Sequence, residues 1–214
     1  MKEELVAGID EVGWGSPAGP LVSCIVVMKG SDRLLLPKGV TDSKKLSPKK
    51  REAFFLQLCQ AVTSVGLGVV EAWEIDRLSP KYALQESYTR ALKELTVKPD
   101  RLIMDGTDGT NLVQSWKGKQ VAIPKADLTH IEVSTASIIG KVFRDTVMGE
   151  IEAKLKRHGL PGYNLGTNMG YLTKDHQAEI DKYGLMFGPE HEFYIHRRSY
   201  CSGMMGKVPI WKPK

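Results

Sequence analysis

Apolar residues follow two periodicities along the chain, and together they predict alternating strands and helices. Short, nearly continuous apolar runs predict buried strands at residues 5–9, 20–28, 64–73, 101–105 and 120–124. Apolar residues at helical spacing predict helices at residues 48–62, 80–95, 132–158 and 173–183. Ser47 before Pro48 is a typical helix start, and Gly159 and Gly184 are fitting helix ends. This order of elements predicts an α/β fold in which helices flank a sheet.

Acidic residues follow three of the predicted strands. Asp10 and Glu11 come after the first strand, Asp105 ends the fourth, and Asp127 follows the fifth. Sites in α/β sheets gather beyond the carboxyl ends of neighbouring strands, so we expect the four acids to converge. The alternative, for each acid alone, is that it caps a turn. Because neighbouring side chains on a strand point to opposite faces, Asp10 and Glu11 are expected to serve one site only if the strand ends or bulges there.

The segment after the first two acids contains Gly13, Gly15 and Gly19, and it has two interpretations. Two acids beside a flexible loop rich in backbone donors indicate a hard cation that bridges protein and phosphate. Glycines after a strand are also typical of a dinucleotide-binding turn. The G-x-G-x-x-x-G spacing, Pro17 and the strand predicted next do not fit that turn, and the acids would repel a pyrophosphate.

Composition places the chain among globular proteins and excludes several classes. A chain of 214 residues with 42% hydrophobic residues can bury the core of one domain, or of one domain with a small appendage. The sequence has no apolar run of 18 residues and an acidic N-terminal segment, so we expect no membrane span, no secretory signal and a cytoplasmic protein. Three scattered cysteines and five histidines lack the spacing of a disulfide framework or a zinc site.

The charge balance favours a polyanionic partner. The net charge is +5 and the pI is about 9.0, which points toward nucleic acid. Basic residues also cluster beside a predicted helix start, at Lys44, Lys45, Lys49, Lys50 and Arg51.

Six segments, taken together and in order, resemble the type 2 ribonuclease H family (ribonuclease HII). They are GIDEVGWGSPAGP at 8–20, DSKKLSPKKRE at 42–52, LIMDG at 102–106, KADLTHIEVSTASIIGKVFRD at 125–145, GYLTKDH at 170–176 and HRRSY at 196–200. The resemblance implies a ribonuclease H-like mixed β-sheet flanked by helices with a small C-terminal helical extension. It places the catalytic domain at residues 1–160 and the extension with its tail, packed on that domain, at 161–214.

The resemblance also implies an activity. A family member is an endonuclease that hydrolyses the phosphodiester on the 5′ side of a ribonucleotide, in an RNA/DNA hybrid or in duplex DNA with embedded ribonucleotides. The family's catalytic acids match Asp10, Glu11, Asp105 and Asp127, which would hold two Mg²⁺ or Mn²⁺ ions. Paired ions suit this reaction because one activates water and the other stabilises the leaving oxygen. We expect a monomer that binds these duplexes and no membrane.

Substrate contacts follow from the same resemblance. The glycine loop, with Gly13, Trp14 and Gly15, would approach the ribose, and Tyr171 would pack against the sugar at the RNA to DNA junction. The residues expected to contact phosphates are Ser43, Lys44, Lys45, Lys125, Ser137 and Lys141.

This chain departs from the family pattern at Trp14, where the family has arginine, and at Ser16, where it has proline. A tryptophan lacks the guanidinium fork but can stack on a sugar or base. Two alternatives follow: a type 3-like ribonuclease H that acts on RNA runs, and a catalytically impaired protein that binds hybrids.

Overall fold

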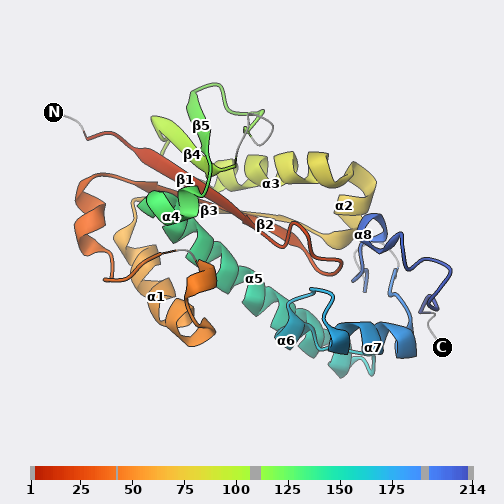
Figure 1. Ribbon diagram of the computed structural model, residues 1–214. Helices are drawn as coiled ribbons and strands as arrows, with labels where there is room; N and C mark the ends of the chain where they lie inside the picture. Colours follow the sequence, from red (N-terminus) through yellow and green to blue (C-terminus); the bar gives the residue numbers. More distant parts are fainter. Residues whose placement is uncertain (1–2, 42, 107–111, 189–192, 212–214) are drawn as a thin grey trace. The chain divides into compact units, whose positions relative to one another are not determined.

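The computed structural model describes residues 3–41, 43–106, 112–188 and 193–211 (Figure 1). The chain forms two compact units that alternate along the sequence. The first unit contains Met1–Val12, Val22–Val69 and Gln85–Val142, and the second contains Gly13–Leu21, Val70–Leu84 and Phe143–Lys214. A boundary between a catalytic domain and an extension at residue 160 therefore stays a prediction from the sequence, and the two units are described separately.

A mixed sheet of five strands forms the centre of the first unit. Its order is β3-β2-β1-β4-β5. β1 pairs antiparallel with β2 and parallel with β4, and β4 pairs parallel with β5. The strands are β1 (Val6–Val12), β2 (Leu21–Met28), β3 (Ser64–Val70), β4 (Arg101–Asp105) and β5 (Lys119–Ile123). Every residue of β2 is buried, as its unbroken apolar sequence predicts.

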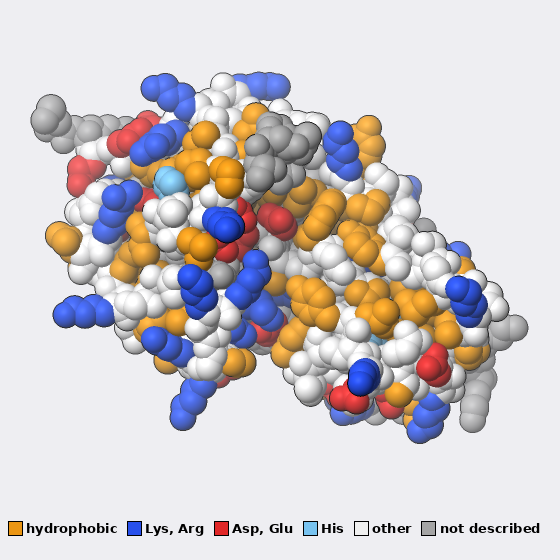
Figure 2. Space-filling model, in the orientation of Figure 1, with side chains coloured by type: hydrophobic (Ala, Val, Ile, Leu, Met, Phe, Trp, Pro, Cys, Tyr) orange, Lys and Arg blue, Asp and Glu red, His pale blue; other side chains and the backbone are white. Residues whose placement is uncertain are grey.

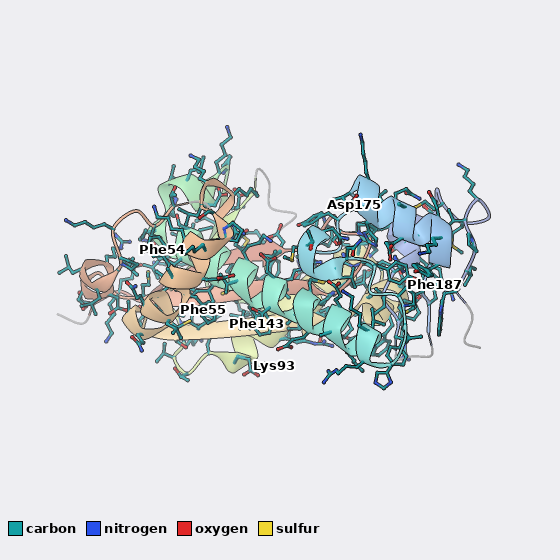
Figure 3. All side chains as sticks on the ribbon, turned by 90° about the horizontal axis from the view of Figure 1, so that it is seen from below. Phe54, Phe55, Lys93, Phe143, Asp175 and Phe187 are labelled. Carbon is teal, nitrogen blue, oxygen red and sulfur yellow. The ribbon has the colours of Figure 1, made fainter. Side chains whose placement is uncertain are left out.

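Helices cover both faces of this sheet. On one face, Leu58 of α1 (Pro48–Ala61) and Ile138 of α5 (Ile131–Arg157) share a core with Cys24 of β2. Figure 3 labels Phe54 and Phe55 on α1, which lies beside the first half of α5 there and in Figure 1. On the opposite face, α3 (Pro80–Glu94) lies so close to β3 that a Cβ on Gly68 would come within 1.8 Å of the Ser87 carbonyl oxygen. The remaining helical segments of this unit are α4 (Ala126–Thr129) and two 3₁₀ turns, Ser31–Leu35 and Ser43–Lys45.

Most predicted elements are confirmed within one or two residues. Ser47 accepts a hydrogen bond from the Lys50 N–H at the start of α1, as its sequence predicts. The strand predicted at 64–73 is too long, because β3 ends at Val70 and α2 (Ala72–Leu78) begins with its own capping box from Glu71 and Glu74. Among the described helices, none has the length and apolar character needed to cross a membrane.

The second unit is largely helical and has its own core. It contains α2, the C-terminal half of α5, and three further helices, α6 (Leu165–Asn168), α7 (Lys174–Tyr183) and α8 (Arg198–Cys201). Its core comprises Ala18, Met148, Leu155, Tyr163, Leu165, Ile180, Leu185, Met186, Ile195 and Cys201. The C-terminal segment is joined to this unit by main-chain hydrogen bonds: the Leu185 N–H donates to the Pro209 carbonyl at 2.8 Å, and the Trp211 N–H donates to the Leu185 carbonyl at 2.9 Å. Residues 212–214 lie outside the described residues.

Two buried histidines form a directed chain of hydrogen bonds in this core. The Met186 N–H donates to Nδ1 of His196 at 2.9 Å, which assigns the ring proton of His196 to Nε2. That Nε2–H donates to Nε2 of His176 at 3.3 Å, and Nδ1–H of His176 donates to the Tyr171 carbonyl at 3.0 Å. Burial, with a smaller contribution from the neighbouring His176, lowers the pKa of His196 to about 3. Both rings are therefore neutral in the folded protein.

Acidification should destabilise the protein through this pair. The pKa of His196 rises from about 3 in the folded chain to 6.5 in the unfolded chain, so the unfolded state binds more protons between these values. The contribution of neutral His196 to the free energy of unfolding is complete above pH 6.5. At pH 5 we expect this free energy to be lower by about 2 kcal/mol. Urea unfolding of wild type, His196→Gln and the exposed control His158→Gln at pH 7 and pH 5 measures this. Only His196→Gln should show a smaller loss, and equal losses in all three would contradict the assignment.

Candidate active site

β1 presents Asp10 and Glu11 on opposite faces of the sheet. Asp10 pairs with Cys24 and Glu11 with Ser23 in an antiparallel register that continues to Val12. The expectation that the strand ends or bulges at these acids is therefore wrong. The parallel pairing of β1 with β4 ends at Ile9, so both acids lie just beyond the last residue pair between the two strands. At that position, carboxylates on either face remain near the end of β4.

Asp10 faces α5 and is held by a chain of hydroxyl groups. The Ser137 hydroxyl hydrogen-bonds the Asp10 carboxylate, and it also lies 2.9 Å from the Ser43 hydroxyl, with both serines buried. Burial, with a smaller contribution from the charge of Asp127, raises the pKa of Asp10 to about 7. The Ser137 hydrogen bond, the Glu11 backbone N–H and the charge of Lys44 act in the opposite direction. Because burial dominates, the Asp10 carboxylate is costly to ionise without a cation.

Glu11 faces α3, where Tyr88 provides its hydroxyl partner. The Tyr88 hydroxyl lies 3.4 Å from Oε2 of Glu11, and its side chain is only 1% exposed. Burial, followed by the charges of Asp10 and Asp105, raises the pKa of Glu11 to about 8, although the Tyr88 hydrogen bond acts in the opposite direction. The two adjacent acids therefore interact electrostatically although they point to opposite faces.

Asp105 and Asp127 complete the acidic group from β4 and α4. Oδ1 of Asp105 accepts hydrogen bonds from the Gly106 and Ala126 N–H groups at 3.0 and 3.1 Å. Asp127 is buried in α4, which begins after Lys125 in the left-handed conformation at φ 56°. Both acids thus have positions fixed by local main-chain geometry, and each acts on the pKa of one acid of β1.

The chemistry of this donor set fits hard divalent cations. Four carboxylates bring only oxygen ligands, which Mg²⁺ and Mn²⁺ prefer, and a cation would offset the burial and the repulsion that raise the pKa values of Asp10 and Glu11. Within the described ranges, no three His, Cys, Asp or Glu side chains are already gathered as ligands of a single ion. The acids interact electrostatically in pairs instead: Asp127 acts on Asp10, and Asp105 acts on Glu11. This suits Mg²⁺, which commonly takes one or two protein carboxylates together with water and substrate phosphate.

The predicted phosphate-binding residues of the first unit fall into two groups. Ser43 and Ser137 are buried and bond each other, so in this structure they orient Asp10. Lys44, Lys45 and Lys125 are exposed, and Lys141 is half-buried. Figure 2 shows acidic side chains lying among several Lys and Arg side chains, close to where α4 is drawn in Figure 1. This arrangement allows cationic side chains to meet phosphates beside the acids.

The other predicted substrate contacts belong to the second unit. Gly13 has φ +87°, and Gly15 has open space where a Cβ would lie. Trp14 is 37% exposed and Tyr171 is 41% exposed, so each presents an aromatic face to solvent. A plain core role for Tyr171 does not fit this exposure.

Two buried arginines of the second unit were not anticipated from the sequence. Arg144 and Arg197 are both 0% exposed and hydrogen-bond backbone carbonyls of residues 13–20, called the glycine loop from here on. The signal for Arg144 was present in its position. It lies four residues after Gly140 and four before Met148, on the buried stripe of α5.

Comparisons with known proteins agree with this geometry. The family model described as Ribonuclease HII matches residues 7–202. The chain is 41% identical to Ribonuclease HII of Prochlorococcus marinus subsp. pastoris over 203 residues, which cover 94% of this chain and 90% of the relative. It is 40% identical to Ribonuclease HII of Carboxydothermus hydrogenoformans over 197 residues, covering 92% and 77% of the two chains.

A solved structure extends the likeness to the fold. The crystal structure of ribonuclease H2 from Pyrococcus horikoshii OT3 matches with a TM-score of 0.72 and 29% identity, covering 95% of this chain and 98% of that chain. The mixed sheet flanked by helices is thus the ribonuclease H-like fold that the motifs imply. Together with the family model, these matches favour type 2 over the type 3 alternative, and the chain belongs to the ribonuclease HII family.

Proposed function

We propose that Asp10, Glu11, Asp105 and Asp127 are the catalytic acids with which this type 2 ribonuclease H hydrolyses the phosphodiester on the 5′ side of a ribonucleotide. The substrates are RNA/DNA hybrids and duplex DNA with embedded ribonucleotides. The observation that carries the proposal is the electrostatic coupling of four carboxylates drawn from β1, β4 and α4, with the pKa values of Asp10 and Glu11 raised to about 7 and 8. Structural acids are ordinarily arranged to avoid such repulsion, whereas functional sites concentrate it.

The four acids would hold Mg²⁺ or Mn²⁺. When bound, paired divalent ions activate water, stabilise the leaving oxygen and neutralise charge that develops on the phosphate. The chain's own groups orient the carboxylates: Ser137 holds Asp10, Tyr88 holds Glu11, and the Gly106 and Ala126 N–H groups hold Asp105. This support keeps each carboxylate in place before a cation or a phosphate arrives.

We further propose substrate contacts for the other residues that the sequence predicts. Lys44, Lys45, Lys125 and Lys141 contact phosphates, together with Ser43 and Ser137 if these hydroxyls reorient. Gly13, Gly15, Trp14 and Tyr171 contact the sugars, where the 2′-hydroxyl distinguishes RNA from DNA. A monomer acting in the cytoplasm is the assembly and location that the sequence predicts.

A cleavage assay with two substrates tests the proposed function. The purified protein is incubated with Mg²⁺ or Mn²⁺ and with either a duplex holding one ribonucleotide or a hybrid holding an RNA run. We expect cuts on the 5′ side of ribonucleotides that leave a DNA 3′-hydroxyl at the single ribonucleotide. Binding of both duplexes without cleavage under either metal would instead support the catalytically impaired alternative.

Removing the Tyr88 hydroxyl should weaken catalysis without unfolding the protein. In Tyr88→Phe, Glu11 loses a neutral donor in a buried setting, so its carboxylate is less well oriented for a cation. Loss of such a supporting group typically costs about 10- to 100-fold in metal affinity or activity. We expect a fall of about tenfold in kcat and weaker Mn²⁺ binding by isothermal titration calorimetry.

The matched control is Tyr82→Phe, because Tyr82 lies on the same helix and is 65% exposed. It should behave like wild type in both measurements. Equal Mn²⁺ affinity in wild type and Tyr88→Phe would show that the hydroxyl does not support Glu11.

A further inference from the structure

Arg144 and Arg197 are fully buried cations in the second unit. Each has 0% of its side chain exposed, and arginine is almost never buried to this degree unless its donors are satisfied. Burial lowers the pKa of both guanidiniums, and the charge of Arg144 lowers the pKa of Arg197 further, to about 10. Placing two like charges together in a core is costly, so their hydrogen-bond partners should indicate which part of the structure they stabilise.

Arg144 connects two segments that are distant in the sequence. Its Nε donates to the Pro20 carbonyl at 2.8 Å and its Nη2 to the Ala18 carbonyl at 3.2 Å, both in the glycine loop. Its Nη1 donates to the Met169 carbonyl at 2.8 Å, two residues before Tyr171. The same guanidinium lies 5.8 Å from the centre of the Tyr171 ring. One planar group thus joins the loop that carries Trp14 to the segment that carries Tyr171.

Two glycines show how closely these segments fit. A Cβ on Gly13 would lie 2.1 Å from Nε of Arg144, and one on Gly170 would lie 2.3 Å from the Ala18 carbonyl oxygen and 2.8 Å from the Ser16 hydroxyl. Ser16 is itself buried and donates to the Ala18 carbonyl at 2.8 Å. The contact therefore has no room for a shifted loop.

Arg197 holds the other side of the same loop. Its Nη1 donates to the Gly13 carbonyl at 2.8 Å and to the Trp14 carbonyl at 3.2 Å, and its Nε donates to the Gly19 carbonyl at 2.9 Å. These contacts fix the main chain of Trp14 but do not reach Tyr171. Arg144 contacts both the loop that carries Trp14 and the Tyr171 ring, and its planar fork satisfies three carbonyls that a lysine ammonium could not reach together.

We infer that Arg144 is a positioning residue for substrate selection, which holds the glycine loop that carries Trp14 and the segment that carries Tyr171 at a fixed separation, so that both aromatic side chains meet the sugars on either side of one phosphate. This inference rests on the proposed substrate contacts. A fixed separation matters most for a single embedded ribonucleotide, because only one register places its lone 2′-hydroxyl correctly. In an RNA run every register presents a 2′-hydroxyl, so a loosened loop still finds one.

The test is Arg144→Lys, which retains the positive charge and removes the fork. We expect kcat/KM to fall about 100-fold on the duplex with one ribonucleotide, the loss typical of a misplacement of about 1 Å, and less than about tenfold on the RNA run. Mn²⁺ binding by calorimetry should stay unchanged, because the hydrogen bonds of Arg144 go to the Pro20, Met169 and Ala18 carbonyls and to none of the four acids. Arg157→Lys, exposed on the same helix, is the matched control and should alter neither rate.

Ser16→Ala provides a milder second variant in case Arg144→Lys does not fold. It removes the hydroxyl bonded to Ala18. We expect the ratio of kcat/KM on the duplex with one ribonucleotide to kcat/KM on the RNA run to fall by about threefold. An unchanged ratio in the folded Arg144→Lys protein, or in Ser16→Ala if the lysine variant unfolds, would overturn the inference. If wild type itself cuts neither substrate, the proposed function fails, which is a separate outcome.

Discussion

Asp10→Asn should abolish cleavage of both substrates while making the metal-free protein more stable. The amide keeps the size of the side chain and can still accept the Ser137 hydrogen bond, but it carries no charge for a divalent ion. Losing several kcal/mol of transition-state stabilisation corresponds to a fall of roughly 1,000-fold or more in kcat. Few substitutions at a buried position are expected to raise stability and remove activity together.

The stability gain follows from the raised pKa of Asp10. A carboxyl whose pKa rises from 3.8 unfolded to about 7 folded contributes stability below pH 3.8 and loses it as the pH rises through 7. At pH 8 in EDTA the wild-type carboxylate is ionised and repelled by Asp127, whereas the amide is not. We expect the melting temperature of Asp10→Asn to be higher by roughly 5 °C.

Asp175→Asn is the control for this experiment. Asp175 lies exposed on α7, away from any acid of the site in the sequence, and is labelled in Figure 3. This variant should retain activity and gain no stability. Cleavage by Asp10→Asn within about tenfold of wild type, with either metal, would contradict the assignment of Asp10.

Gly8→Ala should strongly destabilise the protein. A Cβ at Gly8 would lie 2.2 Å from the Glu132 carbonyl carbon and 2.3 Å from the Val133 nitrogen, both main-chain atoms of the first turn of α5. Because backbone cannot rotate away as a side chain can, strand and helix must separate. We expect a loss of about 3 kcal/mol in urea unfolding and lower activity, since α5 also carries Ser137.

Gly149→Ala is the opposite case on the same helix. A Cβ there meets nothing within 4 Å, so the variant should gain about 1 kcal/mol from better helix propensity. If Gly8→Ala unfolds at the same urea concentration as wild type, the close packing of β1 on α5 is not as described.

The sequence predicts the elements whose signals are local. The Ser47 cap, the five-residue run that ends at Asp105 and the buried stripe of α5 depend on neighbouring residues, and the structure confirms them. The short helix α2 was missed because residues 64–73 read as one apolar run, while the Glu71 capping box ends the strand. Contacts between residues far apart in the sequence are not predicted in this way.

The candidate site shows the same division. The sequence predicts four acids near the ends of neighbouring strands as site residues, but not the faces of the sheet on which they lie. A regular strand through Val12 places Asp10 toward Ser137 and Glu11 toward Tyr88, and only the register with β2 reveals this. Likewise, no pattern around Gly8 indicates that a helix backbone lies against it, because that contact is made by residue 132.

The span of the Arg197 contacts bears on how the enzyme is made. Arg197 reaches Gly13 across 184 residues, so the glycine loop leaves the ribosome long before the side chain that fixes it is synthesised. We therefore expect a prematurely terminated chain ending before Arg197 to carry all four acids but to lack a settled loop. Such a fragment would contain the proposed catalytic acids before the loop proposed to select the substrate is fixed in place.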